Sequence, residues 1–170
     1  MNKQQFWKLV LALCGGIYFL ACAANPAEWH FIDGVNLIIH EAGHVIFSPF
    51  GQFMQVLGGS LNQVLIPLIF AGYFFLHRQY YSGSLVLFWV GENLLNISVY
   101  AGDAIRMQLP LLGGDASLHD WNWLLFYTGL LHQTHAVALS IQITGTAFIV
   151  AATLLAIKFS FSAPETPYET

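Results

Sequence analysis

The chain has 170 residues, of which 56% are hydrophobic and only 8% are charged, and its formal net charge is −4. A small soluble domain needs many more polar groups to cover its surface, since about 25% of the residues of an average globular protein are charged. The composition therefore excludes a small soluble enzyme and a disordered tail. The negative charge and the lack of a basic cluster exclude a nucleic-acid partner. The remaining class is a protein that crosses the lipid bilayer several times.

The first apolar stretch runs from about Phe6 to Ala24, which is long enough for one membrane-spanning helix. Lys3, before this stretch, and Lys8, at its start, favour a cytoplasmic N-terminus by the positive-inside rule. A basic start, an apolar middle and an A-x-A pattern at 21–23 also fit a signal peptide. We expect residues 1–24 to form a retained first helix, with a signal-like segment as the alternative.

The rest of the chain contains two long uncharged runs, of 36 residues (42–77) and 37 residues (121–157), and each is too long for one straight span. Gly51 to Gly59 interrupts the first run and predicts a Gly-rich loop. The expected helices after the first are 33–48, 61–76, 84–100, 120–131 and 136–159. The sequence therefore predicts an all-α membrane protein with five to six transmembrane or re-entrant helices, one domain over 1–161 and a polar tail over 162–170.

The most informative motif is His40-Glu41-Ala42-Gly43-His44, within an apolar stretch. The spacing i, i+4 puts both imidazoles on one helical face, so that two ring nitrogens can reach one metal ion. Glu41 is then placed to act as a general base toward a water at that ion. Zinc suits this set, because it binds imidazole and carboxylate and keeps an open position. Ionisable residues inside a membrane are costly and usually functional.

A catalytic zinc site needs a third protein ligand, and the acidic candidates lie in the later segment GGDASLHDWN. Asp120 stands where a short helix should begin, so that its carboxylate can point back toward the histidine pair. Asp115 is the alternate third ligand, and His119 is a further alternative. Asp33, seven residues before His40, shares the face of that histidine, and it is either the helix N-cap or a hydrogen-bond partner of His40.

These motifs resemble the site-2 protease family of intramembrane zinc metallopeptidases, over residues 33–131. HEAGH at His40–His44 matches the HExxH motif of the family, and Gly58 and Asn62 match its Gly-x-x-x-Asn helix. LPLLGGDASLHDWN is similar to its later Pro-then-Asp segment, although no Asp-Gly dipeptide is present. The resemblance implies zinc-dependent hydrolysis of peptide bonds, with Asn62 orienting the carbonyl or the water. It also implies a β-hairpin or re-entrant strand within 51–59, whose unpaired edge holds an extended substrate.

A second group of polar residues, Glu92, Asn93 and Asn96, lies within the expected helix over 84–100. Polar groups in hydrocarbon need partners, so we expect these side chains to make hydrogen bonds between helices. The alternative is that they supply an extra site carboxylate or an amide that orients the substrate.

Together these features predict a zinc metalloendopeptidase, embedded in a bacterial inner membrane as a multi-pass protein, that acts on membrane-protein or peptide substrates. A non-catalytic metal-binding scaffold or an inactive peptidase homologue is the alternative, because the Asp-Gly dipeptide is missing. A membrane di-iron oxygenase is disfavoured, since the chain has seven histidines and only one pair at HxxxH spacing.

Overall fold

The computed structural model describes residues 1–110, 112 and 119–162, which form α-helices and short 3-10 turns with no strand among them. In chain order the elements are α1 (Lys3–Ala24), α2 (Phe31–Phe47), η1 (Ser48–Phe50), α3 (Gln52–Leu76), α4 (Tyr80–Gly102), α5 (Asp120–Tyr127), η3 (Leu131–Gln133) and α6 (Thr134–Ser160). The expected all-helical fold is confirmed. The polar tail predicted over 162–170 lies outside the described residues from 163 onward.

Four helical segments of the described chain are long and apolar enough to cross a membrane, namely α1, α3, α4 and the segment Leu131–Ser160 that contains α6. They indicate a membrane protein. The number of spans is lower than the five to six expected. α2 has 17 residues and α5 has 8, and an α-helix needs about 20 residues to cross the hydrocarbon core.

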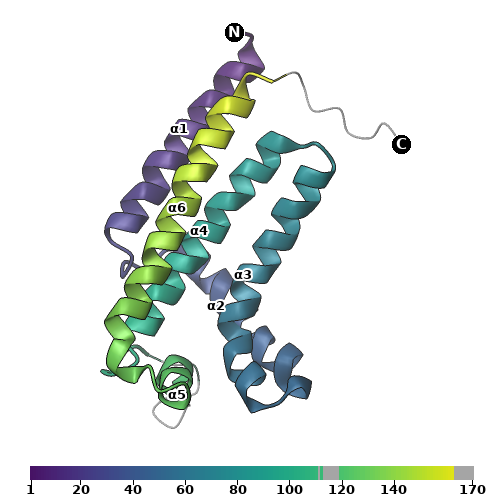
Figure 1. Ribbon diagram of the computed structural model, residues 1–170. Coiled ribbons are helices and arrows are strands. Elements are labelled where there is room, and N and C mark those ends of the chain that lie inside the picture. The colour runs from purple at the N-terminus through teal and green to yellow at the C-terminus, as the bar shows by residue number, and fades with distance from the viewer. Residues whose placement is uncertain (111, 113–118, 163–170) are drawn as a thin grey trace.

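The spanning helices form a bundle in which α6 packs on α1 and α4, and α3 packs on α4 and α2 (Figure 1). The start of α1 and the end of α6 lie at one end of the bundle, where the Gln5 Nε2 donates to the Phe161 carbonyl at 3.0 Å. α5 lies at the opposite end (Figure 1). The chain therefore returns through α6 to the end at which it started.

The contact between α4 and α6 is built on small and apolar residues. The buried face of α6 includes Gly145, Ile149, Ala152 and Ala156. At the crossing, a Cβ added to Gly91 or to Gly145 would lie 2.8 Å from the carbonyl oxygen of the other glycine. Small residues let two backbones approach this closely, which is a common way for helices to associate in a membrane.

α2 has the opposite character, because its buried face is polar. Ile38 and Val45, on its other faces, are 73% and 74% exposed. The apolar stripe that a soluble protein turns inward is therefore turned outward in this helix, as suits a lipid environment. The buried residues of α2 are Asp33, Asn36, His40 and Gly43.

The glycines that follow the HEAGH motif form a helix crossing. α3 begins at Gln52, so Gly58 and Gly59 lie inside a helix, and the expected loop or hairpin over 51–59 is wrong. A Cβ on Gly43 would overlap the Gly58 carbonyl, which means that α2 and α3 touch through their backbones. The absence of side chains at this point serves close packing, and no turn is made there.

Candidate metal centre

His40 and His44 project from one face of α2, as their i, i+4 spacing predicts, and their ring centroids are 4.8 Å apart. His40 is 5% exposed, whereas His44 is partly buried. α3 packs closely over His40, because a Cβ on Gly59 would overlap the imidazole ring. The close helix crossing therefore also encloses the first histidine.

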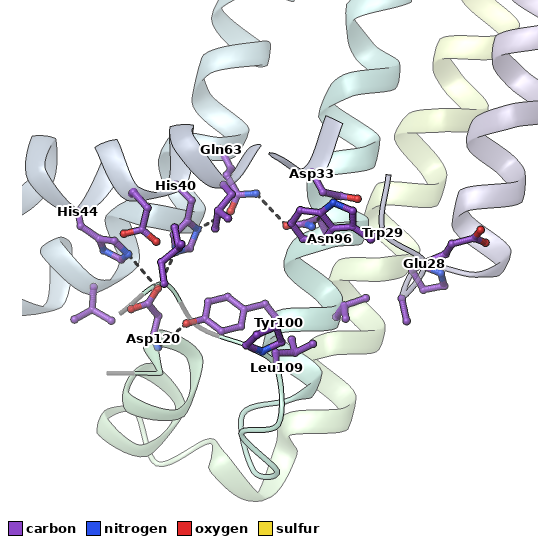
Figure 2. Close-up of a pocket in the computed structure, with 18 of the residues that line it drawn as sticks. Glu28, Trp29, Asp33, His40, His44, Gln63, Asn96, Tyr100, Leu109 and Asp120 are labelled. Atoms are coloured by element: carbon purple, nitrogen blue, oxygen red, sulfur yellow. Dashed lines mark hydrogen bonds and ion pairs between the residues drawn. The ribbon is translucent and has the colours of Figure 1, made fainter. Parts of the chain in front are cut away.

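Asp120 approaches both histidines from the start of α5. Its Oδ2 lies 2.8 Å from the His40 Nε2 and 3.2 Å from the His44 Nε2. Its backbone N–H donates to the Tyr100 hydroxyl of α4 at 3.1 Å, which fixes the start of α5 beside the cluster. Figure 2 shows the three side chains pointing toward one another. Within the described residues, His40, His44 and Asp120 are the group that could hold a metal ion, with ligand atoms all within 4.8 Å of one another.

The carboxylate of this cluster suits a divalent cation. Burial alone would raise the pKa of the Asp120 carboxyl, but its hydrogen bonds with His40 and His44 outweigh burial and lower that pKa. The hydrogen bond to Asp120 is also the largest of the effects that raise the pKa of His44 to about 9. The carboxylate is therefore ionised, and a metal ion would take the place of a proton held between the groups. Two imidazoles and one carboxylate are the ligand set of many catalytic zinc sites.

The two residues predicted to act on the substrate occupy different positions. Glu41 is exposed and lines the cavity that contains the three clustered side chains. Asn62 is buried and lies outside that cavity lining, and its Nδ2 donates to the Ile39 carbonyl of α2 at 2.8 Å. Asn62 therefore links α3 to α2, and its expected role toward the substrate stays a prediction.

Of the two other candidates for the third ligand, the structure describes only His119, which does not join the cluster. Asp115 lies outside the described residues. His119 is the N-cap of α5, where its Nδ1 accepts from the Asn122 N–H at 3.2 Å. Its Nε2 faces the Asp103 carboxylate at 3.4 Å. His119 thus caps the helix that presents Asp120.

A cavity of about 450 Å³ opens onto the cluster. Its size lies within the roughly 300–1,000 Å³ that is usual for ligand pockets. Its walls come from α2, α3, α4, the start of α5 and the connections before α2 and after α4. The residues contributed by the two connections are Pro26, Ala27, Glu28, Trp29, Leu109, Pro110 and Leu112.

The polar residues of α4 make hydrogen bonds between helices, as expected. The Asn36 Nδ2 of α2 donates to the Glu92 Oε2 at 2.6 Å, and the Asn96 Nδ2 donates to the Asp33 Oδ1 at 2.8 Å. Asp33 is the third residue of α2, and the N-cap is His30, whose backbone N–H donates to the Asp33 Oδ2 at 2.5 Å. The interpretation of Asp33 as the N-cap residue is therefore wrong, although its carboxylate does accept a hydrogen bond from the N-cap residue His30.

Sequence reasoning missed Gln63, the residue that contacts the outer nitrogen of His40. Its side chain is 2% exposed, and its Oε1 lies 2.6 Å from the His40 Nδ1. The available signal was a second amide directly after Asn62, in a stretch of α3 without any charged residue. An amide that is buried there needs partners, and one of them is a candidate metal ligand.

Comparison of the chain with protein-family models, curated proteins and solved structures found no match. The cluster of His40, His44 and Asp120 is accordingly interpreted from its own geometry. That geometry combines a candidate metal centre, an acidic residue at its side and a cavity, all at the end of a bundle of apolar helices.

Proposed function

We propose that this chain is an intramembrane zinc metallopeptidase that hydrolyses peptide bonds of membrane proteins. One observation carries the proposal, namely that His40, His44 and Asp120 converge although Asp120 is 80 residues from His40 in the chain. A polar structural patch needs only hydrogen bonds. It does not require two imidazole nitrogens to face one carboxylate oxygen beside a cavity.

The chemistry divides among residues already described. Zinc held by His40, His44 and Asp120 would polarise the scissile carbonyl and lower the pKa of an attacking water. Glu41 takes a proton from the water as its oxygen attacks the carbonyl carbon. Glu41 then gives this proton to the leaving nitrogen as the carbon–nitrogen bond breaks, so that one carboxylate and one amine are formed.

The surroundings of the cluster support a membrane-protein or peptide substrate. The cavity has room for a few residues of an unwound chain, and backbone segments border it before α2 and after α4. A buried helix must unwind before its peptide bond can be attacked. We propose a bacterial inner membrane as its location, where the lipid bilayer would surround the exposed apolar faces of this multi-pass protein.

The test measures zinc per chain in detergent-purified protein and hydrolysis of a mixture of synthetic single-span transmembrane peptides, read by mass spectrometry. We expect about one zinc per chain in the wild type and almost none in His44→Ala. We expect Glu41→Gln to keep its zinc and to lose hydrolysis by roughly 100-fold or more, because the general base is absent.

Two results would overturn the proposal in different ways. Wild-type protein without zinc would reduce the cluster to a hydrogen-bonded polar patch. A zinc-loaded wild type whose Glu41→Gln variant behaves identically, including in complementation of a gene deletion, would favour the non-catalytic metal-binding scaffold or inactive homologue.

A further inference from the structure

His40 makes two different contacts through its two ring nitrogens. The Nε2 faces the Asp120 Oδ2 at 2.8 Å, and the Nδ1 faces the Gln63 Oε1 at 2.6 Å. A neutral imidazole carries one proton, so the Nε2 is available to a metal only when the proton sits on the Nδ1. The ionised Asp120 carboxylate accepts a hydrogen bond from the Nε2, and a metal bound there would displace that proton. The end of the Gln63 amide that faces the Nδ1 then decides whether the remaining proton sits on the Nδ1.

The orientation of Gln63 is fixed by its other partners. Its Nε2 donates to the Asn96 Oδ1 at 3.1 Å and to the Asn93 Oδ1 at 3.3 Å. With the amide nitrogen so engaged, the amide oxygen must face His40. Gln63 is 2% exposed, which leaves little room for water to replace these partners. A flipped amide would present N–H groups to His40 and drive its proton onto the Nε2.

Asn96 is oriented in turn by Asp33, whose carboxylate accepts hydrogen bonds from Asn96 and from the His30 backbone and also contacts the Glu92 carboxyl group. Its Nδ2 donates to the Asp33 Oδ1 at 2.8 Å, and the Asp33 Oδ2 accepts from the His30 backbone N–H at 2.5 Å. This leaves the Asn96 Oδ1 for Gln63. Figure 2 shows the side chains in sequence from Asp33 through Asn96 and Gln63 to His40.

We propose that Asp33 is a positioning residue that sets the tautomer of His40 through Asn96 and Gln63, and so prepares the Nε2 for a metal. The inference rests on the proposed zinc site. The inference assigns a role to Asp33, which does not contact the metal cluster. It also gives a donor and an acceptor to each hydrogen bond between Asp33 and His40. Partners of this kind usually change metal affinity by about 10- to 100-fold when they are removed.

The second histidine provides an internal reference. The His44 Nδ1 donates to the Gln55 backbone carbonyl at 2.8 Å. A carbonyl accepts and cannot flip, so His44 needs no further residues to choose its tautomer. Variants along the Asp33 path are therefore expected to affect His40 and to leave His44 unchanged.

Asp33→Asn tests the direction of the path. The new side chain has one acceptor, which the His30 N–H requires, so an N–H₂ group then faces Asn96 and forces it to turn. The hydrogen bond from Gln63 to Asn93 remains and limits the rotation of the Gln63 amide. We therefore expect cobalt(II) affinity to fall by only about tenfold. Cobalt absorption titration measures the affinity, and nitrogen-15 NMR of labelled histidine reports the proton on the His40 Nδ1 in the zinc-loaded protein.

Two variants of Gln63 separate positioning from folding. Gln63→Met removes the acceptor and should weaken cobalt binding by about 10- to 100-fold, whereas Gln63→Glu keeps an acceptor and should restore most of the affinity. Gln142→Met is the matched control, because this part-buried amide of α6 donates only to the Ala23 carbonyl, at 3.3 Å. It should bind cobalt like the wild type.

Unchanged cobalt affinity in either Asp33→Asn or Gln63→Met would overturn the inference, as would a Gln63→Glu variant no better than Gln63→Met. If Asp33→Asn fails to fold, Gln63→Met and Gln63→Glu still test whether Gln63 sets the tautomer of His40. If the wild type binds no cobalt or zinc, the proposed function fails. The inference is then decided by whether the His40 Nδ1 proton of the wild type is lost in Gln63→Met.

Discussion

α2 and α6 bury residues at the same helical spacing but with opposite chemistry. Between its buried end residues Thr134 and Ser160, α6 buries Gly145, Ile149, Ala152 and Ala156, whereas α2 buries Asp33, Asn36, His40 and Gly43. The period of burial is a property of the helix, and it indicates only which face is turned inward. The residue types on that face indicate its purpose. An apolar face supplies packing, and a polar face among apolar helices is retained for chemistry.

The largest loss of stability is expected when a buried apolar side chain of α6 is truncated. Ile149 is 0% exposed and belongs to a core cluster with Phe88 and Leu95. Ile149→Ala leaves a cavity and should lower the free energy of unfolding by about 2–5 kcal/mol. Unfolding in detergent, followed by circular dichroism, measures the loss. Zinc per folded chain should be unchanged, and a loss of zinc would show that the two faces are not independent.

The two glycine crossings give a matched pair of smaller changes. Gly43→Ala and Gly145→Ala each place a Cβ against a backbone carbonyl of the facing helix, so each should cost about 1–3 kcal/mol of stability. Only Gly43→Ala moves α2 against α3 beside His40. We expect it to reduce zinc content as well, while folded Gly145→Ala keeps its zinc. Equal zinc contents in the two variants would contradict the division between the faces.

Removal of metal should loosen one region of the molecule and spare the other. Asp120 is the first residue of α5, and it would be held to α2 through the metal. We expect a chelator to raise amide hydrogen exchange in α5 by roughly tenfold or more, because the binding free energy no longer stabilises that contact. α6 is the internal control, and an equal rise in α5 and α6 would count against the proposed centre.

The smallest effect is expected for a single amide outside the polar face. Gln142→Leu removes one hydrogen bond from α6 to the Ala23 carbonyl, so stability should fall by about 0.5–1.5 kcal/mol. Hydrolysis and zinc content should equal those of the wild type. A loss of zinc in this variant would show that any buried amide affects the centre, and it would weaken the assignment of Asn96 and Gln63 as specific partners.

The sequence by itself determined the features that depend on local spacing and composition. The content of 8% charged residues indicated a membrane protein, and apolar runs predicted most of the helices. The i, i+4 spacing placed His40 and His44 on one face, because the helical period is a local property of the backbone. Asp120 was named among several candidates on the basis of its place at the start of a helix.

Only the tertiary structure decided the features that depend on how helices cross. Gly58 and Gly59 have the composition of a turn, but they lie inside α3, where their lack of side chains leaves space for Gly43 and His40 of α2. The meeting of Asp120 with the histidine pair depends on where α5 begins relative to α2. The path from Asp33 to His40 uses α2, α3 and α4, and the pairing of hydrogen-bond partners across three helices leaves no periodic signal in any one of them.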